Sequence, residues 1–250
     1  MANIIEITDL TIPPLQVYAG LTHADPGKIS DVFLAESEKV IAYALKSGCR
    51  PVSFLMERQD LDRVSLIHDW PDIPVYTGSR EIIRQLTGYV LDRGYLCAME
   101  RPALPALSSI CEKASRVILL RNISDPTDLG AIFRSAAALG MDAILIGDGC
   151  CDPLYRRSVR VSMGTVFQVP WTTIAESNSL ALHQFTCISV SQNPNATPIK
   201  PELWSDCEKL AIILDAKGSS DSWCIPLMPD TEPMNMAAAS AVLFWMLRKP

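Results

Sequence analysis

The chain has 250 residues, of which 48% are hydrophobic and 20% charged, a composition that excludes disorder and predicts one or two domains with a sizeable core. It carries 22 basic and 28 acidic residues, so its formal net charge is −6 and a globally basic nucleic-acid binder is excluded. Nucleic acid could therefore be held only by local basic groups. No apolar run reaches the roughly 18 residues that a membrane span needs, and the acidic first ten residues do not resemble a signal peptide.

The cysteines and histidines give no sign of a metal site. Eight cysteines are spread irregularly without a Cys-x-x-Cys pair, and the three histidines lack metal-ligand spacing. Most of the cysteines have apolar neighbours and are expected to be small buried side chains, although the adjacent Cys150 and Cys151 could form a redox-active pair. We therefore expect a reduced, cytoplasmic protein without a bound metal.

The first part of the chain alternates between helical and strand patterns, which predicts a small α/β unit. Residues 1–30 contain Pro13-Pro14 and Pro26-Gly27 and are expected to form an irregular arm. The expected elements are a helix at 37–47, a strand at 52–56, a helix at 79–85 and a strand at 95–99.

The pattern is interrupted at 101–108, where two prolines and small residues indicate a boundary between domains. Beyond it, apolar runs alternate with helical segments, which predicts a mostly parallel sheet with a ligand site beyond the carboxyl ends of its strands. The expected strands are 116–120, 143–147, 166–169, 185–190 and 209–214, and the expected helices are 128–139, 153–161 as a helix or turn, and 234–247.

Several common catalytic motifs are absent. No G-x-G-x-x-G opens a helix, and neither a P-loop nor a G-x-S-x-G sequence is present. Standard dinucleotide, P-loop and serine-hydrolase sites therefore have no support.

Three segments at the ends of expected strands could carry chemistry. In the first, Asp128 could cap a helix, Gly130 permits close backbone approach, and Arg134 lies at the flank of the apolar face. By spacing alone, Arg134 could equally be a solvated helix arginine. The second holds the densest basic cluster of an acidic chain, which could be a solvated surface or a phosphate site: Arg156, Arg157 and Arg160.

The third segment runs from Leu214-Asp-Ala-Lys-Gly218 to Ile225-Pro-Leu and Met234-Asn235. An asparagine directly before an apolar helix is typical of a helix cap.

Taken together, the order and spacing of these segments resemble the SpoU-type (TrmH) family of RNA 2′-O-ribose methyltransferases, part of the knotted SPOUT superfamily. The family's first motif, D-P-x-N-L-G-x-x-x-R-[ST]-A, is matched by D-P-T-D-L-G-A-I-F-R-S-A, which contains Arg134. Its second motif, R-x-S-x-G-x-x-F-x-x-P, is matched from Arg160 to Pro170, and its third by Ile225-Pro226-Leu227 and Met234-Asn235. The resemblance covers residues 116–248 and extends more weakly to the front domain.

The resemblance implies an α/β fold in which a C-terminal parallel-sheet domain (106–250) forms a deep trefoil knot. A small α/β domain that binds substrate RNA, similar to a ribosomal protein, would precede it (1–105). It also implies a homodimer formed through the knotted domains, and S-adenosyl-L-methionine bound in the knot. The implied cofactor-binding residues are Leu214, Asp215, Gly218, Ile225, Leu227 and Met234.

The implied reaction is attack of a ribose 2′-hydroxyl of rRNA or tRNA on the sulfonium methyl group of the cofactor. The family gives a central role, sometimes that of general base, to the residue matching Arg134. A guanidinium does not readily give up its proton, however, so gripping a phosphate is the more natural role for this side chain. Asn235 would orient ribose or cofactor, and Ser162 would support the loop of the second motif. The arginines expected to contact RNA are Arg156, Arg157 and Arg160.

The sequence departs from the family pattern at four places. Asp128 replaces the usual Asn, Pro233 replaces a Ser, and Asp215-Ala-Lys-Gly218 stands where G-x-E-G is usual. In addition, only six residues separate Gly218 from Ile225, fewer than the family pattern has. These changes leave two alternatives beside an active methyltransferase: a catalytically impaired knotted protein for RNA binding or assembly, and an enzyme of related fold with another substrate.

Overall fold

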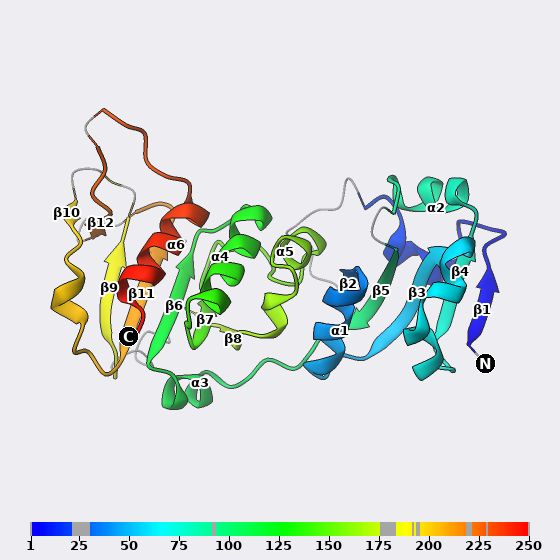
Figure 1. Ribbon diagram of the computed structural model, residues 1–250, viewed down its shortest axis with the longest axis horizontal. Coiled ribbons are helices and arrows are strands. Elements are labelled where there is room, and N and C mark those ends of the chain that lie inside the picture. The colour runs from blue at the N-terminus through cyan, green and yellow to red at the C-terminus, as the bar shows by residue number, and fades with distance from the viewer. Residues whose placement is uncertain are drawn as a thin grey trace. The chain divides into compact units, whose positions relative to one another are not determined.

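The chain divides into two structural units. In the computed structural model the first unit holds residues 1–102 and 154–160, and the second holds residues 103–153 and 161–250 (Figure 1). The structure describes residues 2–21, 31–91, 94–175, 184–191, 193, 196–218, 222–228 and 230–249.

The first unit contains a mixed five-stranded sheet with the order β1-β4-β3-β5-β2. The first three strands in this order run parallel, whereas β5 is antiparallel to both β3 and β2. The strands are β1 (Asn3–Glu6), β2 (Val32–Glu36), β3 (Pro51–Glu57), β4 (Pro74–Gly78) and β5 (Tyr95–Glu100), and the helices are α1 (Glu38–Lys46) and α2 (Arg80–Thr87).

The expectation of an irregular arm over residues 1–30 is wrong for two described stretches of it. Asn3–Glu6 is an edge strand, and Pro13–Tyr18 is a 3-10 helix; residues 22–30 lie outside the described residues. The sequence did not predict strand β1, because all four of its residues are exposed and its pattern has no alternation of apolar and polar side chains.

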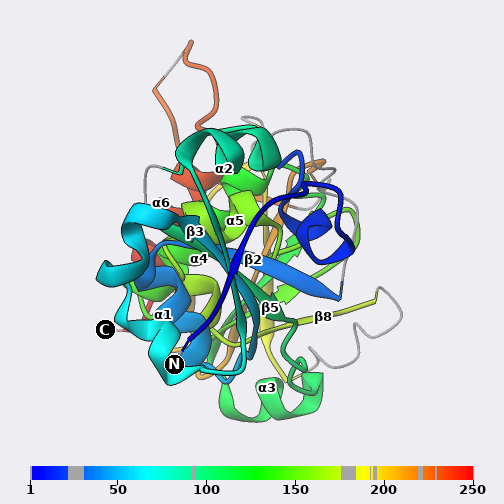
Figure 2. The same ribbon diagram turned by 90° about the vertical axis from the view of Figure 1, so that its right-hand side faces the viewer.

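The 3-10 helix is fixed to the sheet by Tyr18, which is fully buried. The Tyr18 hydroxyl lies 2.9 Å from the carbonyl oxygen of Ser53 and accepts a hydrogen bond from the backbone N–H of Ala98 at 3.2 Å. In Figure 2, β2, β3 and β5 run between α1 and this N-terminal segment. Burial raises the pKa of the Tyr18 phenol, so the hydroxyl stays protonated and can donate.

The second unit contains a sheet of the order β10-β12-β9-β11-β6-β7-β8 in which all described pairs of strands are parallel. This confirms the predicted parallel sheet of the second half. The strands are β6 (Arg116–Arg121), β7 (Ala143–Ile146), β8 (Trp171–Thr173), β9 (Thr186–Val190), β10 (Thr197–Pro198), β11 (Leu210–Asp215) and β12 (Trp223–Cys224).

Three of the described α-helices belong to this unit: α3 (Leu107–Lys113), α4 (Pro126–Ala138) and α6 (Met236–Leu247). Helix α5 (Arg156–Val161) lies almost entirely within residues 154–160, which belong to the first unit. Helix α3 was not expected, because it lies within and directly after the proline-rich boundary. The strand predicted at 166–169 is wrong, since Thr165–Phe167 forms a 3-10 helix and the strand follows Pro170. Two consecutive residues with positive φ, Met163 and Gly164, turn the chain there and prevent an extended run.

The two faces of this sheet are covered by different helices. Residues of α3 pack with Val117, Leu119 and Ala211 in one apolar cluster. Helices α4 and α6 contact each other and lie together over the sheet in Figure 1. None of the helices among the described residues is both long enough and apolar enough to cross a membrane.

An aspartate caps the N-terminus of α4, and an asparagine caps that of α6. The expectation that Asp128 caps α4 is wrong, because the helix starts earlier, at Pro126, and Asp125 accepts from the backbone N–H of Thr127 at 2.6 Å. Proline is favoured at the first helical position, where no hydrogen bond is lost. Asn235 caps α6, as its position before an apolar helix indicates, by accepting from the N–H of Ala238 at 2.8 Å.

The far end of α6 is held by Arg116, whose residue exposure is only 2%. Its Nε donates to the carbonyl oxygen of Leu247 at 3.0 Å, and its Nη1 donates to that of Cys207 at 2.9 Å. A cation at the carboxyl end of a helix also favours the helix dipole. This one side chain therefore joins the start of β6, the end of α6 and the turn before β11.

We expect Arg116→Met to lower the free energy of unfolding by about 2–4 kcal/mol, because buried carbonyl groups lose a charged donor. Urea denaturation measures the change. The matched control is Lys113→Met at the exposed end of α3, with an expected change within about 0.5 kcal/mol. Equal changes for the two variants would show that Arg116 does not hold α6.

Candidate functional site

The carboxyl ends of four parallel strands meet at one edge of the second unit's sheet. β11 pairs with β6 on one side and with β9 on the other, and β6 pairs in turn with β7. The segments that follow these strands are therefore neighbours, although they lie up to about a hundred positions apart in the sequence. Crevices at this edge are the usual ligand sites of parallel α/β sheets.

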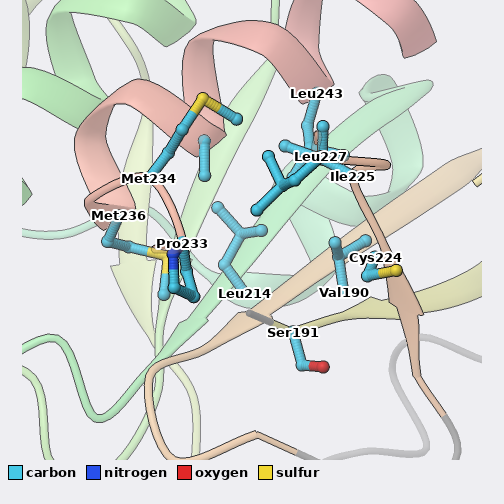
Figure 3. Close-up of a pocket in the computed structure, with 11 residues that line it drawn as sticks. Val190, Ser191, Leu214, Cys224, Ile225, Leu227, Pro233, Met234, Met236 and Leu243 are labelled. Carbon is cyan, nitrogen blue, oxygen red and sulfur yellow. The ribbon is translucent and has the colours of Figure 1, made fainter. Parts of the chain in front are cut away.

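An apolar pocket lies at this edge (Figure 3). Its lining comes from the ends of β9 and β11, from β12, from the chain between β12 and α6, and from the first turns of α6. The lining residues are Val190, Ser191, Leu214, Cys224, Ile225, Leu227, Pro233, Met234, Met236, Ala239 and Leu243.

The pocket is filled largely by its own side chains. The cavity volume is about 30 Å³, which leaves room for about two water molecules. Leu227 is 38% exposed and lies on the connection to α6, so it belongs to a segment that is not held in a core. A larger ligand would have to displace side chains of this segment.

Four of the six residues predicted to bind a cofactor line this pocket: Leu214, Ile225, Leu227 and Met234. The other two, Asp215 and Gly218, belong to the loop that leaves β11 next to it. Asp215 directly follows the lining residue Leu214, and a Cβ added at Gly218 would lie 3.8 Å from the Cβ of Ser191.

Several lining residues were not predicted from the sequence. Val190 and Ser191 could have been, because they end an expected parallel strand. Met236, Ala239 and Leu243 have the i, i+3, i+7 spacing of one helix face, but α6 is apolar on every side and its pattern does not tell which face meets a ligand.

Ser191 brings the one side-chain hydroxyl among the lining residues that the structure describes. Its Oγ lies 2.6 Å from the Oγ of Ser222 and accepts from the N–H of Asn193 at 3.3 Å. Both serines are buried, so this pair is a fixed polar point at the end of an otherwise apolar cavity.

The loop after β11 is tied to the loop after β6 by a hydrogen bond between side chains. Asn122 Nδ2 donates to Asp215 Oδ1 at 2.8 Å. The same carboxylate oxygen accepts from the backbone N–H of Lys217 at 2.9 Å. Asn122 was not among the predicted site residues, and no motif singled it out.

The residues predicted to be catalytic lie at different places in the second unit. Arg134 is exposed on α4, where a guanidinium can reach a ligand in solvent. Ser162 is fully buried, and its Oγ accepts from the N–H of Gly164 at 3.2 Å, so it fixes the turn after α5. Neither residue lines the pocket, and Asn235 caps the helix that does.

The three arginines predicted to contact RNA differ in their surroundings. Arg156 pairs with the buried Glu36 at 3.2 Å and lies over the ring of Tyr89, 4.7 Å from its centre. Arg160 is 4.0 Å from the same carboxylate and remains half exposed, whereas Arg157 is exposed. Burial raises the pKa of Tyr89 to about 12, although the positive charge of Arg156 opposes the shift. Arg156 is thus committed to contacts within the first unit.

Asp128 lies at the junction of α4 and α6. Its carboxylate accepts a hydrogen bond from the backbone N–H of Ala237, in the first turn of α6. Partial burial, reinforced by the nearby charge of Asp125, raises the pKa of this carboxyl group above its ordinary value. The ionised form of Asp128 is therefore disfavoured in the folded state, although the N-terminus of α6 favours a negative charge.

The described part of the chain contains no group of three or more His, Cys, Asp or Glu side chains that could hold a metal ion. Neither Cys150 nor Cys151 forms a disulfide, and burial raises the pKa of Cys150. A raised pKa lowers the reactive thiolate fraction, so a redox role for this pair has no support in its surroundings.

The fold and the site therefore define a class of protein: a parallel α/β protein with a pocket at the carboxyl edge of its strands. The sequence model of the SpoU rRNA Methylase family matches residues 115–245, which span this pocket and more than half of the chain. The chain belongs to the SpoU rRNA methylase family.

Two relatives extend the comparison along the sequence. An uncharacterised tRNA/rRNA methyltransferase of Mycobacterium tuberculosis is 33% identical over 187 residues, which cover 69% of this chain and 65% of that protein. The 23S rRNA (guanosine(2553)-2′-O)-methyltransferase RlmP of Bacillus subtilis is 24% identical over 241 residues, which cover 88% of this chain and 89% of that protein. The match thus spans slightly less than two thirds of the mycobacterial relative.

Among solved structures, an AdoMet-bound rRNA methyltransferase from Sinorhizobium meliloti has a TM-score of 0.77 and 19% identity. The superposition covers 98% of both chains, so the two proteins share a fold over their whole length.

The raised pKa of Asp128 predicts how stability depends on pH. Because the folded protein binds the proton more readily than the unfolded chain, the ionised carboxylate costs stability at neutral pH, and this cost disappears as the pH falls through the raised pKa. Asp128→Asn removes the charge and retains an oxygen that can accept from Ala237.

We therefore expect Asp128→Asn to be more stable than the wild type in urea denaturation at pH 7, with a gain that shrinks towards pH 4. Asp72→Asn, at an exposed site of the first unit, serves as the control and should show no such trend. A variant less stable than the wild type at pH 7 would contradict the electrostatic explanation.

Proposed function

We propose that this protein is an S-adenosyl-L-methionine-dependent methyltransferase that modifies the ribose 2′-hydroxyl of an rRNA or tRNA. The observation that carries the proposal is the pocket at the carboxyl edge of the sheet, which lies within the residues matched by the family. The names of the RlmP relative and of a structural neighbour described as an RNA 2′-O ribose methyltransferase support the choice of a ribose oxygen.

The chemistry of the lining fits this cofactor. Leu214, Ile225 and Leu227 present aliphatic surface suited to the faces of a purine ring, and Ser191 offers a polar contact for its edge. Met234 would extend the apolar wall, while the loop of Asp215 and Gly218 would supply polar groups beside it. With about 30 Å³ of free space, the segment between β12 and α6 must yield on binding.

When bound, the cofactor supplies an electrophilic methyl group on a positively charged sulfur. The chain's own residues then have to align the RNA ribose with it and exclude water. Arg134, an exposed guanidinium on α4, would grip the phosphate next to the target ribose through two parallel hydrogen bonds. A guanidinium carries only hydrogen-bond donors, so it is a poor acceptor for the hydroxyl proton.

Ser162 and Asn235 would act by positioning. Ser162 holds the turn of the second motif, and Asn235 fixes the start of α6, from which Met236, Ala239 and Leu243 reach the pocket. The exposed Arg157 and the half-exposed Arg160 would add phosphate contacts. Arg156 is paired with Glu36 and would stabilise the surrounding structure instead.

We further propose that residues 1–105 form the domain that binds substrate RNA and that residues 106–250 form the methyltransferase domain with a deep trefoil knot. Two observations support a knot: β12 lies beyond β9 in the sheet, and α6, which follows β12 in the chain, packs against α4. Cytoplasmic RNA is the expected substrate.

A homodimer through this domain is part of the proposal. Trp245 on α6 is 59% exposed and stacks with Arg248, 3.4 Å from the ring centre to the guanidinium carbon. An exposed aromatic side chain on an apolar helix suits the centre of an interface. Sedimentation should give twice the mass of the chain, and a monomer would contradict this part of the proposal.

We expect Arg134→Ala to abolish methyl transfer while the affinity for the cofactor stays within about threefold, because a phosphate contact is lost and the pocket is untouched. Transfer is measured with radiolabelled S-adenosylmethionine and RNA from cells that lack the gene. Labelled dinucleotides that resist alkaline hydrolysis identify a 2′-O-methyl group, since this cleavage requires a free 2′-hydroxyl. Lys113→Ala is the control that should retain activity.

Full turnover by Arg134→Ala would contradict the role of this residue. Binding of RNA without any binding of S-adenosylmethionine at millimolar concentration would favour the alternative, a catalytically impaired RNA-binding or assembly protein. The observation that favours this alternative is the altered third motif at residues Asp215 to Gly218.

A further inference from the structure

Asn122 occupies a special position directly after β6. Its φ is +57°, a left-handed conformation that asparagine tolerates better than most other residues. Its backbone N–H donates to the carbonyl oxygen of Asp148 at 2.9 Å, which ties it to the segment after β7. The residue thus begins the loop of the first motif with a fixed turn.

The side chain of Asn122 contacts two further loops at the same edge. Towards β7, its Oδ1 lies so close to Gly149 that a Cβ there would come within 2.5 Å of it. Towards β11, its Nδ2 donates to Asp215 Oδ1 at 2.8 Å. One amide therefore joins the loops that follow β6, β7 and β11.

Asp215 uses this contact to shape the loop beside the pocket. The carboxylate oxygen that accepts from Asn122 also accepts from the N–H of Lys217, and the carbonyl oxygen of Asp215 accepts from the N–H of Gly218 at 3.0 Å. The N–H of Ala216 donates to the carbonyl oxygen of Arg121 at 3.2 Å, next to Asn122 in the chain. The loop is thus fastened to β6 by a backbone bond and a side-chain bond.

The pair also accounts for an unusual feature of the third motif. Asp215 stands at a position where the family pattern has glycine, so its carboxylate would add an unbalanced charge beside the pocket. Asn122 supplies a donor to this carboxylate, and hydrogen bonds to a charged acceptor are stronger than those between neutral groups.

We propose that Asn122 is a positioning residue for the cofactor loop, and that it acts through its hydrogen bond with Asp215. This inference rests on the proposed function, because the loop matters for cofactor affinity only if the neighbouring pocket holds the cofactor. The role is indirect: Asn122 fixes Asp215, and Asp215 fixes the backbone of residues 216–218.

Isosteric exchanges test the pair without removing volume. Asn122→Asp keeps the shape of the side chain and tolerates a positive φ. It places a carboxylate oxygen where Nδ2 of Asn122 now lies, 2.8 Å from Asp215 Oδ1. Asp215→Asn alone retains an oxygen that can accept from both Asn122 and Lys217. The double exchange, Asn122→Asp with Asp215→Asn, reverses donor and acceptor between these two side chains. The amide nitrogen that then faces residue 122 can no longer accept from the N–H of Lys217.

Calorimetry with S-adenosylhomocysteine, together with hydrogen–deuterium exchange over residues 214–218 of the unliganded protein, follows cofactor affinity and loop order separately. We expect Asn122→Asp to weaken the affinity about tenfold and to speed exchange of the Lys217 amide, because two carboxylates repel. The double variant should bind S-adenosylhomocysteine more tightly than Asn122→Asp, because it removes the repulsion between the two carboxylates. Asp215→Asn alone measures the effect of removing the charge of Asp215 itself.

Unchanged affinity and unchanged exchange in Asn122→Asp would overturn the role of the pair. The same conclusion would follow if the double variant were as weak as Asn122→Asp, since the effect would then not depend on Asp215. Failure of the wild-type protein to bind S-adenosylhomocysteine would instead overturn the proposed function, and with it the cofactor role of the loop.

Discussion

Parallel pairing of β11 between β6 and β9 is the constraint on which the candidate site depends. The register places Asp215 opposite Arg121 and Leu214 opposite both Leu120 and Val190, so three strands end at the same level. Because all the described pairs of this sheet are parallel, segments that are distant in the sequence meet at one edge. The pocket, the loop after β11 and the start of α4 all follow from this alignment.

The site combines an apolar cavity with a few polar groups that the surrounding backbone fixes. Ser191 is paired with Ser222, Asp215 with Asn122, and Asn235 with the first turn of α6. Polar groups that are already held need little reordering when a ligand binds, which lowers the entropic cost of binding. The small free volume shows that the segment between β12 and α6, rather than these polar groups, must adapt.

Much of this arrangement could be predicted from the sequence, because strong local signals coincide with the true elements. The apolar run at 116–120 and the Asn235 cap were predicted correctly, and four predicted cofactor residues line the pocket. The edge strand β1 was missed because its side chains are exposed on both faces. Asn122 was missed for a different reason: its role depends on a partner 93 positions away, which only the strand order brings near.

The central claim is that the pocket between β9, β11 and α6 holds S-adenosylmethionine. Titration calorimetry of the wild type and of Ala239→Leu, which adds a larger side chain to the buried pocket wall, tests it most directly. The account predicts that the wild type and the exposed control Ala138→Leu bind S-adenosylhomocysteine and that Ala239→Leu does not. Equal affinity of the wild type and Ala239→Leu would place the cofactor elsewhere and contradict the account.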